Sequence, residues 1–71
     1  MTISSQALSG QEQLRLENLL NTASSRRLRQ LESLMAKSIR EAISDPGLTA
    51  ANVNGKIAAR LKVNIPEITQ P

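Results

Sequence analysis

The chain has 71 residues, and its nine Lys and Arg residues against six Asp and Glu residues give a formal net charge of +3. It contains no Cys, His, Phe, Trp or Tyr, which excludes disulfides, imidazole or thiol catalysis and the stacking of bases on aromatic rings. We therefore expect one small domain, residues 1–71, that acts by contact and needs no metal ion, cofactor or small-molecule substrate.

Residues 1–8 are rich in Ser, Thr and Gln and show no clear hydrophobic period, so we expect a flexible tail. They lack the basic and apolar segments of a signal peptide. No apolar run in the chain approaches the ~20 residues needed to cross a bilayer. These features predict a cytoplasmic protein with no membrane partner.

A first helix is predicted over residues 10–22. Ser9 and Glu12 have the spacing of a capping box, in which each side chain accepts a hydrogen bond from the backbone N–H of the other residue. Apolar side chains then recur at helical spacing on one face, at Leu16, Leu19, Leu20 and Ala23. Leu14 lies outside this stripe.

A second helix is predicted over residues 26–44, with an apolar stripe of Leu28, Leu31, Met35, Ile39 and Ala42 that Leu34 and Ile43 widen. This stripe is rotated by roughly 100° from the first one. Supercoiling drifts only about 20° per heptad and does not explain the rotation. We predict a turn at residues 22–25 that folds two antiparallel helices into a hairpin; the alternative is one continuous helix with different partners along its length.

A shorter third helix is predicted over residues 49–62. Asp45, Pro46 and Gly47 form a loop before it, and either Thr49 or Asp45 with Pro46 is placed to cap it. Its apolar positions are Ala50, Val53, Ile57 and Leu61, and Gly55 weakens it. Residues 64–71 carry two prolines and β-branched side chains, which favour an extended, flexible tail.

The predicted fold is all-α, a helical hairpin plus a shorter third helix. A chain this short buries little surface, so we expect self-association to complete a small bundle. Leu14, Leu34 and Ile43 lie at or beyond the margins of the main stripes. They are the candidate residues for a homo-oligomer interface, and the alternative is that they are edge residues of the core.

Opposite the second apolar stripe, positively charged side chains follow one line of the helix. We call this line the cationic row: Arg26, Arg29, Ser33, Lys37 and Arg40. No carboxylate interrupts the row, whose charges repel one another until an anion arrives. The row is a candidate contact surface for a protein partner or a nucleic acid. The alternative is an ordinary solvated face, supported by Glu32, which is placed to pair with Arg29.

Small and apolar residues near the C-terminus stand at Ala58, Leu61, Val63 and Ile68. With them, residues 57–69 resemble the helix-turn-helix pattern of DNA-binding proteins, which implies DNA binding. Lys62 stands where that motif most often has Gly, and Pro66 falls in the first turn of the recognition helix. The alternative is an amphipathic helix followed by a tail.

The sequence contains no recognisable motif for catalysis or for phosphate binding. The carboxylates are scattered and form no recognisable acid–base pair, the serines have no histidine to activate them, and three isolated glycines make no phosphate loop. The leading hypothesis is a non-enzymatic interaction module, an adaptor, regulator or docking element, that self-associates and binds a protein partner. The alternative is a DNA-binding regulator that uses the cationic row or the segment 57–69.

Overall fold

The structure, a computed structural model, describes residues 8–70 and confirms an all-α fold. Three α-helices, α1 (Gly10–Thr22), α2 (Ser25–Ile43) and α3 (Val53–Asn64), are followed by a short 3-10 helix, η2 (Pro66–Thr69). The described residues contain no strand. Residues 1–7 of the predicted N-terminal tail lie outside this range.

The predicted capping box opens α1. The Ser9 N–H donates to Glu12 Oε1 at 2.9 Å, and the Glu12 N–H donates to Ser9 Oγ at 3.1 Å. These two bonds satisfy backbone donors that a helix start leaves without partners. The helix therefore begins at Gly10, as the sequence predicts.

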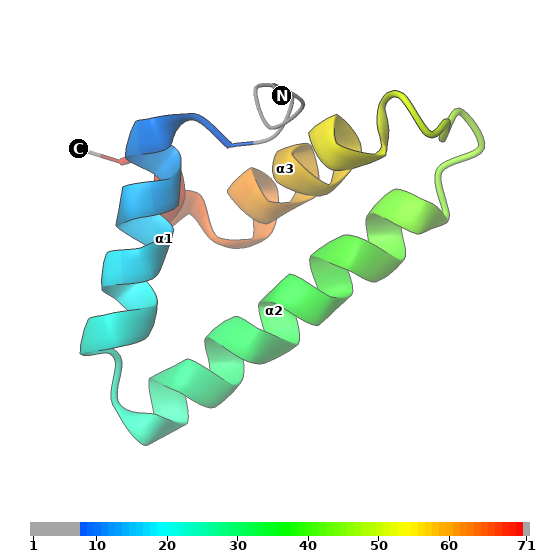
Figure 1. Cartoon of the computed structure of the whole chain (residues 1–71). Coiled ribbons are helices and arrows are strands. Elements are labelled where there is room, and N and C mark those ends of the chain that lie inside the picture. The colour runs from blue at the N-terminus through cyan, green and yellow to red at the C-terminus, as the bar shows by residue number, and fades with distance from the viewer. Residues whose placement is uncertain (1–7, 71) are drawn as a thin grey trace.

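The break between α1 and α2 is confirmed at Ala23 and Ser24, which are both extended. Ser24 is the N-cap of α2, and its hydroxyl accepts a hydrogen bond from the Arg27 N–H. The chain turns back here, but α1 and α2 diverge from the turn instead of packing along their lengths (Figure 1). The C-terminal segment fills part of the opening and packs against α1.

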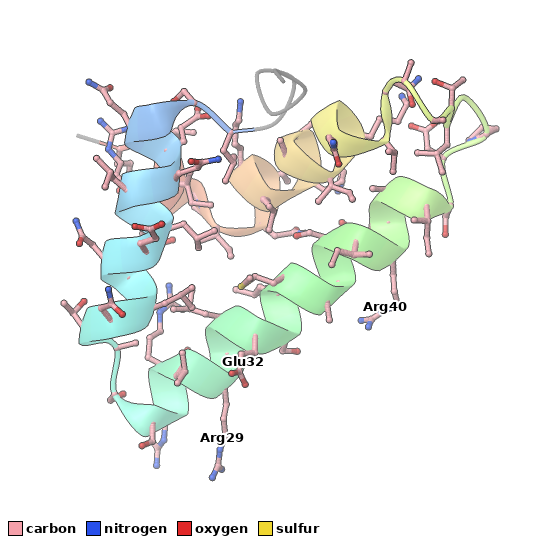
Figure 2. All side chains as sticks on the ribbon, viewed as in Figure 1. Arg29, Glu32 and Arg40 are labelled. Carbon is pink, nitrogen blue, oxygen red and sulfur yellow. The ribbon has the colours of Figure 1, made fainter. Side chains whose placement is uncertain are left out.

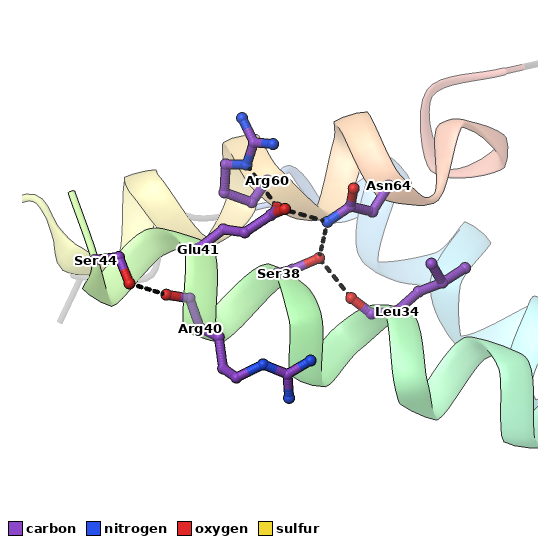
Figure 3. A network of polar contacts seen from close by, with 7 residues as sticks. All are labelled: Leu34, Ser38, Arg40, Glu41, Ser44, Arg60 and Asn64. Carbon is purple, nitrogen blue, oxygen red and sulfur yellow. Dashed lines mark hydrogen bonds and ion pairs between the residues drawn. The ribbon is translucent and has the colours of Figure 1, made fainter.

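Helix α3 runs antiparallel to α2 and packs along it (Figure 1). A polar network fixes the register of the two helices (Figure 3). Asn64 Nδ2 donates to Ser38 Oγ at 2.8 Å and to Glu41 Oε1 at 3.1 Å, and Arg60 Nε donates to the same Glu41 oxygen at 3.0 Å. Ser38 is fully buried, and its hydroxyl donates a hydrogen bond to the Leu34 carbonyl at 2.7 Å.

Replacing Asn64 with alanine should lower the free energy of unfolding by about 2 kcal/mol, because two hydrogen bonds are lost and one of them involves a charged carboxylate. Asn54→Ala is the matched control, since Asn54 is exposed on the same helix and gains the same helix propensity. Urea unfolding followed by circular dichroism measures the difference. Equal stabilities of the two variants would show that the network does not hold α3.

The third helix begins at Val53, later than predicted. Thr49 and Asn52 hydrogen-bond each other across a turn, with the Thr49 N–H donating to Asn52 Oδ1 at 2.7 Å and the Asn52 N–H to Thr49 Oγ1 at 3.1 Å. Asn52 is the N-cap of α3, and neither Thr49 nor Asp45 caps it directly. Asp45 instead accepts the Gly47 N–H within the preceding loop.

The C-terminal tail expected over residues 64–71 is the main error of the sequence-based prediction. Asn64 is the last residue of α3, and Ile65 and Ile68 are 0% exposed. Together with Leu31 they form the centre of the core. The partly buried side chains packed around this centre come from all three helices, from the segment before α1 and from the break between α1 and α2: Leu8, Leu16, Leu19, Leu20, Ala23, Leu34, Met35 and Leu61.

Two arginines outside the core bind η2 through a hydrogen bond and an ion pair. Arg15 Nη1 donates to the Ile68 carbonyl at 3.1 Å, and Arg27 Nη2 pairs with Glu67 Oε2 at 2.6 Å. Pro66 suits the first turn of η2, because an N–H at that position would have no intrahelical partner. Pro66 therefore belongs to a packed turn and not to an extended tail.

The buried face of α2 also differs from its predicted stripe. Leu31, Ser38 and Ala42 are buried, whereas Ile39 is 46% exposed and Ile43 is 55% exposed. Because α3 packs on the side of α2 that carries Ser38 and Glu41, the core face is rotated away from Ile39. Ile39 is thus a surface residue and not the core residue that the stripe predicts.

Candidate functional site: the cationic row of α2

The cationic row lies on the outer side of α2. All five of its residues, Arg26, Arg29, Ser33, Lys37 and Arg40, are exposed. Figure 2 shows Arg29 and Arg40 projecting from the side of α2 that faces away from α3, and Figure 3 shows Arg40 pointing away from the polar network. From Arg26 to Arg40 the row spans about 21 Å at 1.5 Å per residue.

The other cations of the chain are engaged in contacts that hold the fold. Arg27, Lys56, Arg60 and Lys62 pair with Glu67, Asp45, Glu41 and Glu12 respectively. Arg15 donates to the Ile68 carbonyl. Within the described part of the chain, the four cations of the row have no ion pair, so the structure leaves the excess positive charge on one helix face.

Glu32 does not neutralise the row. Glu32 is exposed, and its carboxylate has no cation within 4.0 Å among residues 8–70. The ion pair with Arg29, which would have supported the alternative of an ordinary solvated face, is therefore not formed. In Figure 2 Glu32 leaves the helix on a different side from Arg29 and Arg40.

The charges of the row oppose local helix stability. Arg26 stands in the first turn of α2, which contains no acidic residue, although the positive end of the helix dipole favours carboxylates there. Like charges also stand one turn apart in two pairs, Arg26 with Arg29 and Lys37 with Arg40, and such pairs destabilise a helix. Among the described residues, no ion pair of the row compensates for this loss of helix stability. Local sequence choices that oppose the stability of the fold are expected at functional sites.

A shallow depression of about 290 Å³ adjoins the row, lined by Arg27, Gln30, Ser33 and Leu34. Its only charged lining residue, Arg27, is held by Glu67 and by a hydrogen bond to Gln30 Oε1 at 3.3 Å. The depression thus offers polar groups beside Ser33 and no pair of groups placed for proton transfer.

The three residues predicted for self-association do not form one surface. Leu14 is 59% exposed on α1, and Ile43 is 55% exposed at the far end of α2. These two segments lie at opposite sides of the molecule (Figure 1). Leu34 is half-buried and packs against the core, so it serves as an edge residue of the core instead.

The helix-turn-helix resemblance of residues 57–69 is not matched by the structure. Up to residue 70, where the described chain ends, no second α-helix follows α3; the four residues of η2 form a 3-10 turn instead. Ile68 faces the core, and Glu67 is engaged by Arg27. This segment has no recognition helix to present to a DNA groove.

Three carboxylates that hold the fold have lowered pKa values. A hydrogen bond from the Ser9 backbone lowers the pKa of Glu12, one from the Asn64 side chain lowers that of Glu41, and one from the Gly47 backbone lowers that of Asp45. The neighbouring cations Lys62, Arg60 and Lys56 act in the same direction. All three side chains are therefore ionised at neutral pH.

This predicts acid destabilisation. A carboxyl group whose pKa is lowered by folding stabilises the protein above its unfolded pKa, near 4.3 for Glu and 3.9 for Asp, and that contribution is lost as the pH falls through the folded value. We expect the melting temperature to change little between pH 7 and about pH 5 and to fall below about pH 4. Glu41→Gln should flatten the fall; an unaltered profile in this variant would exclude Glu41 as a contributor.

No protein-family model matches the chain, and comparison with curated proteins and with solved structures finds no significant match. Between residues 8 and 70, no helix combines the length and apolar character needed to cross a membrane.

Proposed function

We propose that the chain is a non-enzymatic binding module whose contact surface is the cationic row of α2, and that duplex nucleic acid is its partner. The observation that carries the proposal is the separation of charges. The cations outside the row contact carboxylates or a carbonyl of the fold, whereas Arg26, Arg29, Lys37 and Arg40 lie exposed together on one face without an ion pair in the described chain.

The shape of the row suits a regular polyanion. Its charges follow one straight helix for about 21 Å, which corresponds to about six base pairs at 3.4 Å per pair. Ser33 lies in the middle and offers a hydroxyl donor, a group that commonly binds phosphate oxygens. The chain carries no aromatic ring on which unpaired bases would stack, which disfavours single strands.

This mode of binding reads the phosphate backbone and not the base sequence. Neutralising four phosphates predicts a slope of log K against log salt of about −3.6, so affinity should fall about 150-fold between 50 and 200 mM salt. An acidic protein surface remains the competing partner, since it would be attracted by the same charges.

Fluorescence anisotropy with a labelled 20-base-pair duplex of arbitrary sequence tests the proposal. We expect binding at 50 mM salt with the steep salt dependence given above, no preference among duplex sequences and weaker binding to single strands. The absence of binding to the duplex at 50 mM salt would refute the proposal.

A further inference from the structure

A second uncovered row runs along α2 beside the cationic row. We call it the lateral row: Glu32, Ala36, Ile39 and Ile43. Its residues are all exposed and are spaced 4, 3 and 4 residues apart, about 90° around the helix from the cationic row. Ile39 and Ile43, at 46% and 55% exposure, stand one turn apart, whereas Leu14 and Val63 are exposed singly on other helices.

We propose that the lateral row is the contact surface for a second copy of this chain, with the two α2 helices packed antiparallel. Alternating spacings of 3 and 4 residues keep side chains on one line of a helix that faces another helix. A two-fold axis between Ala36 and Ile39 places Ile39 of each copy level with Ala36 of the other, and Ile43 level with Glu32. Ile39 and Ala36 of the two copies then meet at the centre of the interface, and Ile43 of each copy lies at one end, beside the aliphatic stem of Glu32 of the other copy.

Charge complementarity favours the second copy as the occupant. In this register Arg40 of the second copy lies three residues, about 4.5 Å, along the axis from the level of Glu32. Both side chains are exposed and lack an ion pair among the described residues, and the two-fold axis forms the same contact twice. A parallel pair would instead set Glu32 against Glu32. The surface is therefore self-complementary only in the antiparallel arrangement.

The interface is small. Two half-exposed isoleucines per copy on a single helix fall well short of the roughly 1,000 Å² of a stable interface, so we expect a weak dimer with a dissociation constant of about 10⁻⁴ M to 10⁻³ M. The antiparallel arrangement places equivalent sides of the two helices on the same face of the dimer, with the two cationic rows together there. The dimer itself requires no polyanion and is independent of the proposed function.

Sedimentation equilibrium of the full chain from 10 µM to 1 mM, without nucleic acid, tests the inference. We expect the average mass to rise toward that of a dimer with concentration. Glu32→Arg should weaken the dimer at least tenfold by opposing Arg40, and the exchanged pair Glu32→Arg with Arg40→Glu should restore it.

Two exposed-residue variants serve as controls, Leu14→Ser and Val63→Ser, which should leave the dissociation constant unchanged, with circular dichroism confirming that each variant is folded. A wild-type chain that is monomeric at 1 mM would overturn the inference. A dimer that survives Glu32→Arg but is lost in Leu14→Ser would also overturn it, because α1 would then supply the interface.

Discussion

Replacing Ile68 with alanine should lower the free energy of unfolding by about 3–4 kcal/mol. Ile68 is completely buried at the centre of the core with Leu31 and Ile65, and truncating such a side chain removes apolar contacts and leaves a cavity. A domain of this length has a total stability of about 4–11 kcal/mol. The melting temperature, followed by the helical circular dichroism signal, should fall by roughly 15–30 °C.

Val63→Ala is the matched control for this experiment. Val63 is also a β-branched residue near the C-terminus, but its side chain is 62% exposed, so the variant should change stability by less than about 0.5 kcal/mol. If both variants melted at the same temperature, the C-terminal segment would not belong to the core.

Removing the charges of the cationic row should abolish duplex binding without harming the fold. We expect a variant with Gln at Arg26, Arg29, Lys37 and Arg40 to lose the steep salt dependence, because no charged contact to phosphate remains on α2. Its stability should equal or slightly exceed that of the wild type, since Arg26 opposes the helix dipole and the like charges repel one another.

A charge-matched control distinguishes the row from net charge. The quadruple Gln variant carries −1 in place of +3, and the same net charge results from introducing Glu at four exposed positions away from α2: Gln11, Gln13, Asn54 and Gln70. Charges beyond about 10 Å are largely screened at 0.1 M salt, so this control should retain most of the binding and its salt slope. Equal losses in both variants would show that net charge alone attracts the duplex.

Local signals in the sequence were sufficient to predict α1 and the break after it. The Ser9–Glu12 capping box and the leucine stripe of α1 depend only on residues within one or two turns. The rotation between the stripes likewise located the turn at Ala23 and Ser24. The exposed cationic row followed from helical periodicity, because its residues lie opposite the apolar stripe.

The sequence does not predict the packed C-terminal segment, because its two prolines and β-branched residues favour an extended chain when no tertiary contact is considered. Pro66 is compatible with the first turn of a 3-10 helix, and Ile65 and Ile68, three residues apart, share a face at three residues per turn. That spacing was the one available signal. The contacts of Arg15 and Arg27 with η2 left no local signal, since each joins residues at least 40 positions apart.

The burial of Ser38 and the exposure of Ile39 depended on tertiary contacts in the same way. A helical stripe fixes which residues share a face but not where a neighbouring helix packs on its edge. The hydrogen bonds of Asn64 and Arg60 hold α3 against the side of α2 that carries Ser38, which leaves Ile39 exposed beside Ile43. The exposure of the lateral row therefore depends on tertiary contacts and does not follow from the sequence pattern of α2 alone.

The most direct test of the binding surface is an NMR titration of the ¹⁵N-labelled chain with a short duplex at 50 mM salt. We predict the largest chemical-shift changes at five residues of α2: Arg26, Arg29, Ser33, Lys37 and Arg40. The residues of α1 and α3 should change little. Changes centred on α1 or on the loop between α2 and α3, or no changes at all, would contradict this prediction.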